Sequence, residues 1–565
     1  MISVDRRAFG SMVLALLGTR ALPVSAQTPP ATRLYVGNAA RLTVQIPSDW
    51  TVGTSTIGSV ATFDYEGAAG FVVSLPLIGP TLDEAAAFLA ASPRFAGSEA
   101  TVTTTTWSGG PARRVDGRIE GASASALVVP HPSPFDLFEE RMAYAALVTD
   151  VDSFARISET LSFTPDRVSP EDFVTSVIEL VEARAYWSAG VDWDAAREQA
   201  RIDIDGLTDV SLTQGAIANI VGHLTGVGDN HSFVRSPSQA AAQGQGAGVG
   251  LLIGGRRVML VYPDGPADRA GVRAGDVIEA VDHSPFYPPP GSSDPSALMG
   301  FEAELTLRRA GLTDTITVTV EQGPYSQYLA PTGRRLAGDL GYIQLPGAIA
   351  PGRNADYVAA ARAVITAIDQ RPSRGWVIDL RLDTGGSYSP MIAGIGPILG
   401  NGRFFGWVWA DGREGWVTYT DGRILGSGQD VPDYSGEAPV PHELARLPVA
   451  VLTSPQTRSA GEVTTLAFVG RTGARRFGET TSGKTTGTVT HFLFDGTTLA
   501  LAEVAMMDRL GATHLSGVEP DEPVPIDWES YGIDDDPVLQ SAIAWLNQQP
   551  APGDATPALE SVLRD

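Results

Sequence analysis

Strands and helices alternate along the chain after Leu336, and this alternation is the strongest constraint on the fold. Two short apolar runs, Gly375–Leu380 and Pro448–Ser454, have the length and composition of buried strands. Asn354–Asp369 has the pattern of a helix that precedes the first of them. Strands joined through helices pair in parallel, because a parallel neighbour is reached only by a crossover connection. The sequence therefore predicts a largely parallel α/β core over residues 336–530.

Ser459 stands where the strand at Pro448–Ser454 gives way to an apolar helix over Val463–Val469. A serine at such a junction exposes its hydroxyl beside backbone N–H groups that can bind an oxyanion. A basic side chain brought to that hydroxyl would make it a nucleophile. However, Ser459-Ala-Gly-Glu462 is also the pattern of a capping box, in which the two side chains only satisfy the first helical turn. On the local pattern alone, both interpretations stay open.

Two further segments contain residues suited to the same chemistry. Lys484 follows Ser459 by 25 residues, in the run Thr481-Ser-Gly-Lys-Thr-Thr-Gly487. Gly385 and Gly386 come just after the strand at Gly375–Leu380. Two glycines at the carboxyl end of a strand permit close approach of the backbone to a ligand.

The composition excludes several classes of protein. With 565 residues, of which 43% are hydrophobic and 19% charged, the chain is globular and long enough for several domains. A formal net charge of −25 argues against a nucleic-acid partner, because phosphate binding needs a basic face. The absence of cysteine excludes disulfides and thiolate chemistry. The seven histidines are scattered, and His442-Glu443 lacks the second histidine of a zinc helix, so we expect no metal and no cofactor.

The N-terminus has the pattern of an export signal over residues 1–26. Arg6-Arg7 precedes the short apolar stretch Ser11–Leu17, and the small residues Pro23–Ala26 form a cleavage site. The paired arginines indicate a twin-arginine signal, with an ordinary secretory signal as the alternative. No later stretch reaches the length of about 20 apolar residues that a spanning helix needs. We therefore expect a periplasmic or secreted protein that is not an integral membrane protein.

Three segments lie outside the predicted core at residues 336–530 and outside the segment at residues 245–322, which is described below. Residues 33–165 read as an α+β accessory domain, and the ending Tyr144–Phe163 resembles small PsbP-like domains. Residues 169–238 read as helices, which end at Asp229-Asn-His231-Ser232 and are followed by a linker at Gln239–Gly246. Residues 531–565 are expected to form a C-terminal helix and tail.

The segment 245–322 resembles a bacterial PDZ domain. The resemblance rests on Gly248-Val-Gly-Leu-Leu-Ile253 and on the glycine and aspartate positions of Gly265–Val281. It implies that Gly248, Val249, Gly250 and Leu251 capture a peptide carboxylate while the peptide adds a strand to the sheet. A small β-domain used only for packing is the alternative.

The chain contains seven landmarks, which are in order Asp229–Ser232, the PDZ segment, Gly341–Leu345, Ile378–Gly386, Ser459–Glu462, Phe477–Lys484 and Gly517–Asp521. Taken together, they resemble the tail-specific, or carboxyl-terminal-processing, serine protease family and its tricorn-like relatives over about residues 169–530. This resemblance implies a crotonase-like (ClpP-like) protease core with a helical cap, an inserted PDZ domain and the N-terminal accessory domain.

The resemblance also assigns roles in acyl transfer. Ser459 matches the nucleophile, and the oxyanion hole is assigned to Gly385 or Gly386 together with the amide of Ala460. A serine can cap a helix by geometry and still act as a nucleophile, so the capping-box pattern does not conflict with this role.

The base is left open between two residues. Processing proteases use a lysine placed as Lys484 is, often with a glutamine four residues later, where this chain has Thr488. Tricorn-like members use a histidine at a site resembling His231, although the acid that they carry shortly before Gly517-Val518 is absent here. Either side chain could instead be structural, His231 in loop packing and Lys484 as a solvated cation. We favour His231, because an imidazole needs almost no change in pKa and an amine needs several units.

The function expected from the sequence is that of an exported serine endopeptidase. It would hydrolyse extracytoplasmic proteins or peptides, with the PDZ segment presenting a substrate tail. The main alternative is a non-catalytic peptide- or ligand-binding protein on the same fold. A scaffold assembled through residues 33–165 is a third interpretation.

Overall fold

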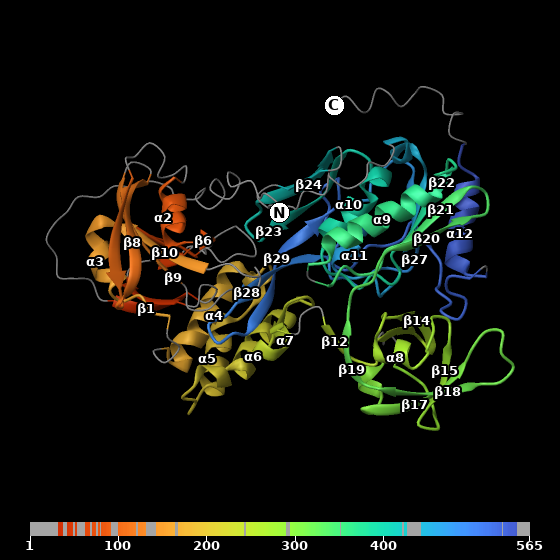
Figure 1. The fold of residues 1–565 in the computed structure, drawn as a ribbon, viewed down its shortest axis with the longest axis horizontal. Coiled ribbons are helices and arrows are strands. Elements are labelled where there is room, and N and C mark those ends of the chain that lie inside the picture. The colour runs from red at the N-terminus through yellow and green to blue at the C-terminus, as the bar shows by residue number, and fades with distance from the viewer. Residues whose placement is uncertain are drawn as a thin grey trace. The chain divides into compact units, whose positions relative to one another are not determined.

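The fold is described from a computed structural model of the chain. Its contacts divide the chain into two compact units, which are described separately (Figure 1). The first comprises residues 1–240, 428–430 and 488–503, and the second comprises residues 241–427, 431–487 and 504–565. The described residues are 32–37, 42–48, 51–52, 63–67, 70–74, 77–78, 81–91, 100–119, 122–130, 143–163, 168–241, 245–289, 294–350, 352–420, 423–426, 442–533 and 535–550. The predicted export signal at residues 1–26 lies outside them.

An antiparallel sheet with two helices forms the larger part of the segment predicted as the accessory domain. The sheet has five strands in the order β6-β10-β9-β8-β7. Thr81 caps the first helix, since its hydroxyl accepts the N–H of Glu84. The elements are β6 (Leu77–Ile78), α2 (Leu82–Ala90), β7 (Thr101–Trp107), β8 (Gly110–Ile119), β9 (Ala122–Pro130), β10 (Ala143–Asp150) and α3 (Val151–Ser158). Smaller sheets contain β1 (Thr32–Gly37) with β2 (Leu42–Pro47), and β3 (Thr51–Val52) with β4 (Phe63–Gly67) and β5 (Gly70–Ser74). The PsbP-like resemblance stays a prediction.

Three helices follow where the sequence indicates them. α4 (Pro170–Arg184) begins after Ser169, whose hydroxyl accepts the N–H of Asp172. α5 (Trp193–Asp203) and α6 (Gln214–Thr225) follow, and apolar side chains of α4 and α6 share one core. After α6 the chain reaches β11 (Phe233–Arg235), which pairs with the first residues of β29 (Thr498–Met507). The predicted base His231 therefore lies in a short loop between a helix and a strand.

The segment predicted as a PDZ domain is a small sheet with one short helix. β13 is an edge strand in the order β13-β14-β15-β17-β18, and side chains from all five strands share a core. An edge strand is what an added peptide strand requires. The elements are β13 (Leu251–Gly254), β14 (Arg257–Val261), α8 (Pro266–Arg269), β15 (Val277–Val281), β16 (Ser284–Pro285), β17 (Glu302–Arg308) and β18 (Ile316–Glu321).

The linker predicted at Gln239–Gly246 is wrong in part. α7 (Pro237–Ala241) enters it, and β12 (Gln245–Gly248) pairs with β19 (Gly323–Ser326). The glycine that suggests a linker has a packing role, because a Cβ on Gly246 would lie 2.1 Å from the ring of Tyr325. The strand exists because of a partner about eighty residues away, so local composition does not reveal it.

The predicted α/β core is confirmed as a six-stranded sheet in the second unit. Its order is β20-β21-β22-β26-β27-β30, and every pair from β21 onward is parallel (Figure 1). Each residue of β22 and β26 is buried, which explains their continuous apolar sequences. The strands are β20 (Thr332–Leu336), β21 (Leu340–Gln344), β22 (Gly375–Asp379), β26 (Val449–Thr453), β27 (Ala474–Gly478) and β30 (Glu522–Pro523). The crotonase-like description stays a prediction.

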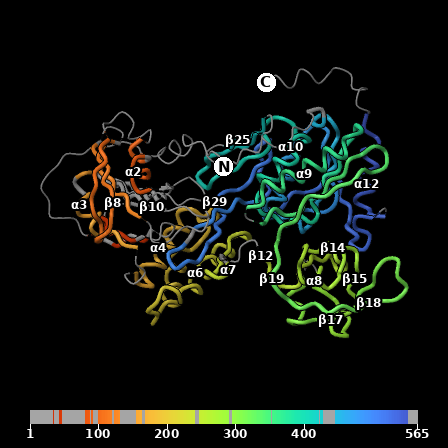
Figure 2. Tube along the Cα trace, viewed as in Figure 1, coloured from red at the N-terminus to blue at the C-terminus, as the bar shows by residue number. Residues whose placement is uncertain are grey.

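Helices cover both faces of this sheet (Figure 2). Ile378 and Val451 pack with α9 (Asn354–Ile368), α10 (Tyr388–Leu399) and α11 (Ala460–Leu466) on one face. Their neighbours Val377 and Leu452 pack with α12 (Pro537–Asn547) on the other. Adjacent strand residues thus enter opposite cores, as the pleat requires. α12 lies within residues 531–565, where the sequence predicts a C-terminal helix and tail.

A second, antiparallel sheet was not predicted. β23 (Gly402–Trp409) pairs with β24 (Glu414–Thr420), with Val504–Met507 of β29 on its other side. β25 (Arg423–Gly426) follows β24, and β28 (Thr486–Phe492) pairs with β29.

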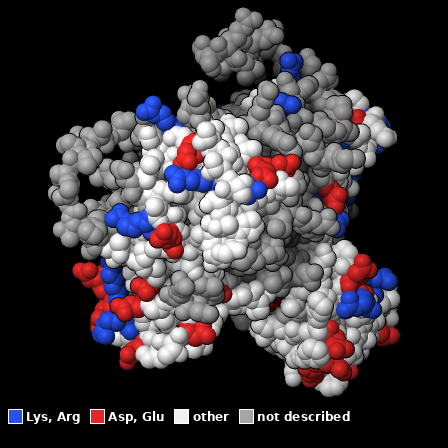
Figure 3. All heavy atoms as spheres, turned by 60° about the vertical axis from the view of Figure 1, so that its left-hand side comes forward, with Lys and Arg blue, Asp and Glu red and all other residues white. Residues whose placement is uncertain are grey.

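The charged side chains are intermixed on the surface that Figure 3 draws. Blue and red residues alternate there among large uncharged areas, and the described residues form no broad basic area on that face. Among the described residues, no helix combines the length and apolar character needed to cross a membrane.

Candidate active site

Ser459 occupies a strained turn between β26 and α11. Its backbone angles are φ 51° and ψ −112°, a region that side chains with a Cβ rarely adopt. Such a conformation costs about 1–3 kcal/mol and persists only where surrounding bonds impose it. A sharp strand-to-helix turn with a serine at its apex is the geometry that exposes a nucleophilic hydroxyl. The helix begins at Ala460 rather than near Val463 as predicted, so its first N–H groups lie directly beside the serine.

The end of the neighbouring strand β22 holds this turn in place. The Ser454 hydroxyl donates to the carbonyl of Arg381 at 2.6 Å, and the Thr457 hydroxyl donates to Leu380 at 2.8 Å. The N–H of Arg458 donates to the carbonyl of Asp383 at 2.9 Å. The segment before Ser459 is thus bonded at three points to the segment that leads into Gly385 and Gly386.

Glu462 joins Ser459 to the loop that precedes Lys484. Its carboxylate is fully buried and accepts the Ser459 N–H at 3.0 Å. It also accepts the hydroxyls of Thr481 (2.5 Å) and Ser482 (3.1 Å) and the Gly483 N–H at 2.8 Å. Burial raises the pKa of Glu462 and these donors oppose the rise. The glutamate of the predicted capping box therefore connects two segments of the site, in addition to satisfying a helix end.

The two predicted glycines, Gly385 and Gly386, lie against the turn at Ser459, at positions that exclude a side chain. A Cβ on Gly385 would lie 3.0 Å from the Cβ of Ser459, and one on Gly386 would lie 2.2 Å from the carbonyl oxygen of Ala348. Both glycines have positive φ. Gly385 donates its N–H to Asp383, which leaves Gly386 as the glycine better suited to bind a ligand oxygen. The Ala460 N–H belongs to the first turn of α11, where such groups have no partner within the helix.

Lys484 lies in a loop that is fixed on both sides. Gly483 before it bonds to Glu462, and Thr485 after it donates its hydroxyl to the carbonyl of His514 at 2.7 Å. Lys484 itself is half-buried, and Thr488 is exposed. The structure thus brings Ser459, Ala460, Gly385, Gly386 and the lysine loop together within the second unit.

His231 lies in the first unit, on a loop organised by Asp229. The Asp229 carboxylate accepts the N–H groups of His231 (2.8 Å) and Ser232 (2.9 Å) and the Ser232 hydroxyl (2.5 Å). That hydroxyl accepts the N–H of Ala502 in turn. His231 is 7% exposed. These bonds hold the backbone of His231 in one conformation. A general base needs such a fixed position.

One histidine–carboxylate pair near the lysine loop was not predicted. His514 Nε2 lies 2.8 Å from Asp508 Oδ2, and the carboxylate of this pair is buried. The carbonyl of His514 accepts the Thr485 hydroxyl, so the pair stands beside the Lys484 loop. The available signal was the position of His514 three residues before Gly517, in the segment that leads into the landmark Gly517–Asp521.

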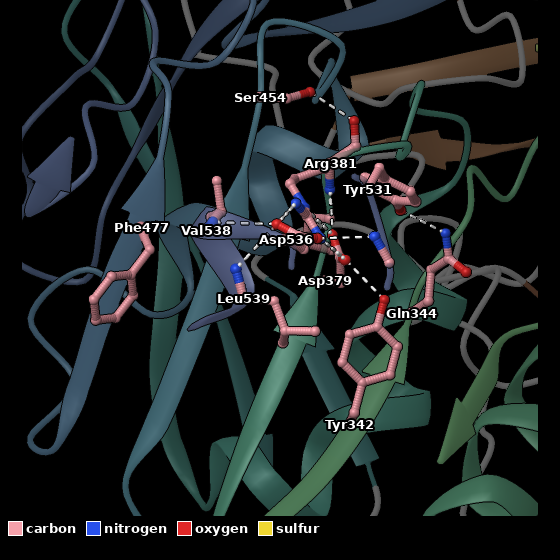
Figure 4. Close-up of polar contacts among 12 residues, drawn as sticks. Tyr342, Gln344, Asp379, Arg381, Ser454, Phe477, Tyr531, Asp536, Val538 and Leu539 are labelled. Carbon is pink, nitrogen blue, oxygen red and sulfur yellow. Dashed lines mark hydrogen bonds and ion pairs between the residues drawn. The ribbon is translucent and has the colours of Figure 1, made fainter. Parts of the chain in front are cut away.

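A buried ion network fixes the strand that leads into the glycines (Figure 4). Arg381 Nη2 lies 2.7 Å from Asp379 Oδ2 and 2.8 Å from Asp536 Oδ2, and all three side chains are buried. Tyr342 donates its hydroxyl to Asp379, and the ring of Tyr531 lies 4.3 Å from the guanidinium. Because Asp536 also caps α12, the network connects that helix to the end of β22.

We expect Asp536→Ala to destabilise the second unit strongly. Removing one partner of a buried ion pair costs about 3–5 kcal/mol, because the other charge stays buried and unpaired. The urea midpoint, followed by tryptophan fluorescence, should fall clearly. Asp411→Ala is the matched control, because Asp411 pairs with Arg413 in an exposed site where such pairs contribute about 0–1 kcal/mol. Equal shifts for the two variants would contradict a structural role for the network.

Comparisons with known proteins agree with this geometry. Residues 339–524 match the model of peptidase family S41, and residues 257–286 match the model of a PDZ domain. The core is a peptidase S41 domain. The family predicted from the sequence, with its PDZ domain, is thereby confirmed. The S41 domain contains Ser459, Lys484 and both glycines, whereas His231 precedes it.

Two curated relatives match parts of the chain. The nisin-resistance protein of Lactococcus lactis subsp. lactis is 29% identical over 175 residues, which are 31% of this chain and 50% of that protein. The chloroplastic carboxyl-terminal-processing peptidase 2 of Arabidopsis thaliana is 29% identical over 308 residues, 51% of this chain and 55% of that protein. The chain spans about half the length of the curated relatives it matches. Among solved structures, the photosystem II D1 C-terminal processing protease has a TM-score of 0.42 at 24% identity, over 68% of this chain and 99% of that one.

Proposed function

We propose that the protein is a serine endopeptidase in which Ser459 attacks the peptide carbonyl. The observation that carries the proposal is the turn at Ser459, which is strained and bonded through Glu462 to the Lys484 loop. Such strain is retained where the surrounding structure imposes it for function. The base, His231 or Lys484, takes the serine proton and returns it to the leaving amine, and water then releases the acyl group.

The oxyanion of the tetrahedral intermediate is assigned to the N–H groups of Ala460 and Gly386. Both belong to backbone held against Ser459, so they need no rearrangement when charge develops on the substrate oxygen. One such donor contributes about 3–4 kcal/mol of transition-state stabilisation. The sequence left Gly385 and Gly386 as alternatives. We choose Gly386, because the Gly385 N–H already donates to Asp383.

A fluorophosphonate probe tests the proposal directly. A nucleophilic serine forms a covalent phosphonyl adduct, so the purified protein should be labelled at Ser459 and should cleave unstructured proteins. Ser454 is the matched control residue, since its hydroxyl is buried and donates to Arg381. Absence of both labelling and cleavage would favour the alternative of a non-catalytic binding protein on the same fold.

The PDZ segment is proposed to capture the substrate tail along β13, with Gly248, Val249, Gly250 and Leu251 receiving the terminal carboxylate. β13 also contacts the nucleophile segment, because Gln456 donates its side-chain amide to the carbonyl of Ile253 at 3.2 Å. A groove of this kind adds affinity at a distance from the chemistry.

We expect deletion of residues 248–322 to weaken the cleavage of proteins more than that of short peptides. A short peptide reaches Ser459 without using the groove, whereas a protein loses its tethering. The measurement is kcat/KM for a protein and for a short peptide derived from its cleavage site. Equal losses for both substrates would instead assign the segment a structural role, exerted through the contact between Gln456 and Ile253.

Export through the signal at residues 1–26 completes the proposal. It would place the peptidase in the periplasm or outside the cell, with extracytoplasmic proteins or peptides as substrates. Cell fractionation of the full chain, compared with a chain lacking residues 1–26, tests this part separately from the chemistry.

A further inference from the structure

Asp383 has an unusual environment next to the proposed nucleophile. Its carboxyl group is completely buried, although it belongs to the short segment between β22 and the two glycines. Oδ1 accepts the Gly385 N–H at 3.0 Å. Within the part of the chain that the structure describes, Oδ2 has no hydrogen-bond partner. A buried carboxyl group with a single donor requires an explanation, because buried polar atoms are normally paired.

The same residue is bonded to the two segments that carry the proposed oxyanion hole, beside Gly386 and before Ala460. Through its side chain it holds Gly385, and through its carbonyl it accepts the Arg458 N–H at 2.9 Å. It also packs against the first turn of α11, where a Cβ on Gly461 would lie 2.8 Å from the Asp383 Cγ. Asp383 therefore lies between the glycine segment and the nucleophile turn and is bonded to each.

No cation neutralises this carboxyl group among the described residues. Arg381, on the same segment, is bonded to Asp379 and Asp536. Arg458 reaches Asp383 only through its backbone N–H.

One titratable group on each of two neighbouring helices is also engaged elsewhere. On α11, Glu462 binds Ser459 and the lysine loop. On α9, Tyr357 donates its hydroxyl to the carbonyl of Pro346. Burial raises the pKa of Asp383 well above its usual range, and the donor at Gly385 opposes the rise only in part.

We propose that Asp383 is a positioning residue that acts as an uncharged carboxylic acid and holds the Gly386 and Ala460 N–H groups toward the substrate oxygen. The proposal rests on the serine peptidase function given above. A carboxylate at this place would be an unpaired buried charge, which proteins avoid by admitting water or by shifting the chain. It would also repel the oxyanion that develops on the substrate a short distance away. Loss of the Asp383 proton should therefore impair catalysis without removing the nucleophile.

The test compares Asp383→Asn with Asp383→Ala in the full chain. Asparagine keeps the shape and the oxygen acceptor but has no proton to lose. Asp383→Asn should therefore stay active and should lose the alkaline fall in kcat that the proposal predicts for the natural protein. Alanine removes the bond to Gly385, so kcat should fall about 100-fold, as for loss of an oxyanion-hole donor, with KM little changed. An alkaline fall that persists in Asp383→Asn, or full activity of Asp383→Ala, would overturn the proposal.

A stability measurement keeps the proposal testable if the peptidase function fails. Asp383 has a higher pKa in the folded protein than in the unfolded chain, where it is about 3.9. The folded state then binds more protons above that value, so the free energy of unfolding should decrease as pH rises from about 4 toward the raised pKa. Asp383→Asn should remove this contribution and should be more stable than the natural protein at neutral pH.

Asp411→Asn is the control for this measurement, because Asp411 is exposed and paired with Arg413. It should leave the decrease of stability above about pH 4 unchanged. If Asp383→Asn and Asp411→Asn give the same dependence of stability on pH, Asp383 is ionised and the proposal is wrong. Absent labelling of Ser459 in the natural protein would refute the peptidase function alone.

Discussion

Replacing Ser459 with alanine is expected to abolish peptide hydrolysis and to leave the fold intact. Loss of a serine nucleophile costs about 10⁶-fold in kcat in a protease whose other site groups remain. The bonds that shape the turn involve the backbone, since the Ser459 N–H donates to Glu462 and its carbonyl accepts from Val463. Alanine keeps both. The measurement is turnover of a fluorogenic peptide by the purified variant, with its urea midpoint recorded beside that of the natural protein.

Ser459→Gly provides a control that separates chemistry from strain. Glycine adopts positive φ without a steric penalty, so this variant should be as inactive as Ser459→Ala but more stable, by up to about 1–2 kcal/mol. Turnover retained by either variant would remove Ser459 from the mechanism. Equal stability of the glycine and alanine variants would show that the turn is not strained.

The core was predictable because its signals are local. β22 and β26 are buried on both faces, so their sequences are continuously apolar and can be read as strands without knowledge of their partners. The helix starts at Ser169 and Thr81 were predictable for the same reason, since each cap bonds to an N–H three residues later. In the S41 domain, Ser459 follows the buried strand β26, and Gly385 and Gly386 follow the buried strand β22. These positions can be read from the sequence as well.

The features that were missed depend on residues far apart in the chain. β12 exists because β19 pairs with it, and Arg381 is paired with an aspartate 155 positions later. The helix after Ser459 was predicted to extend to Val469, but it ends at Leu466, because the N–H groups of Phe468 and Val469 bond three residues back rather than four. An aspartate before two glycines gave no sign that its carboxyl group would be buried without a counter-ion. Such facts arise only when the segments are packed.

Local sequence patterns do not decide which residue is the base. Replacing the base is expected to cause the second large loss of activity. If His231 takes the serine proton, His231→Ala should lower kcat about 10²–10⁴-fold, the usual contribution of general base catalysis. Activity should then rise with pH through the range in which an imidazole loses its proton, about pH 6–7. Lys484→Ala should cost much less, and so should His514→Ala, which is the control for a histidine that pairs with a carboxylate elsewhere.

The physical case for His231 rests on what each side chain would need. A lysine becomes a base near neutral pH only when burial lowers its pKa by several units, and Lys484 is only half-buried, with Thr488 in place of the partner glutamine. An imidazole needs no such change, and the Asp229 carboxylate already holds the backbone of His231 in place. The contacts of Glu462 with the Lys484 loop argue in the other direction. If Lys484→Ala is inactive, His231→Ala keeps its rate and the ascending limb lies nearer pH 7–9, the lysine is the base.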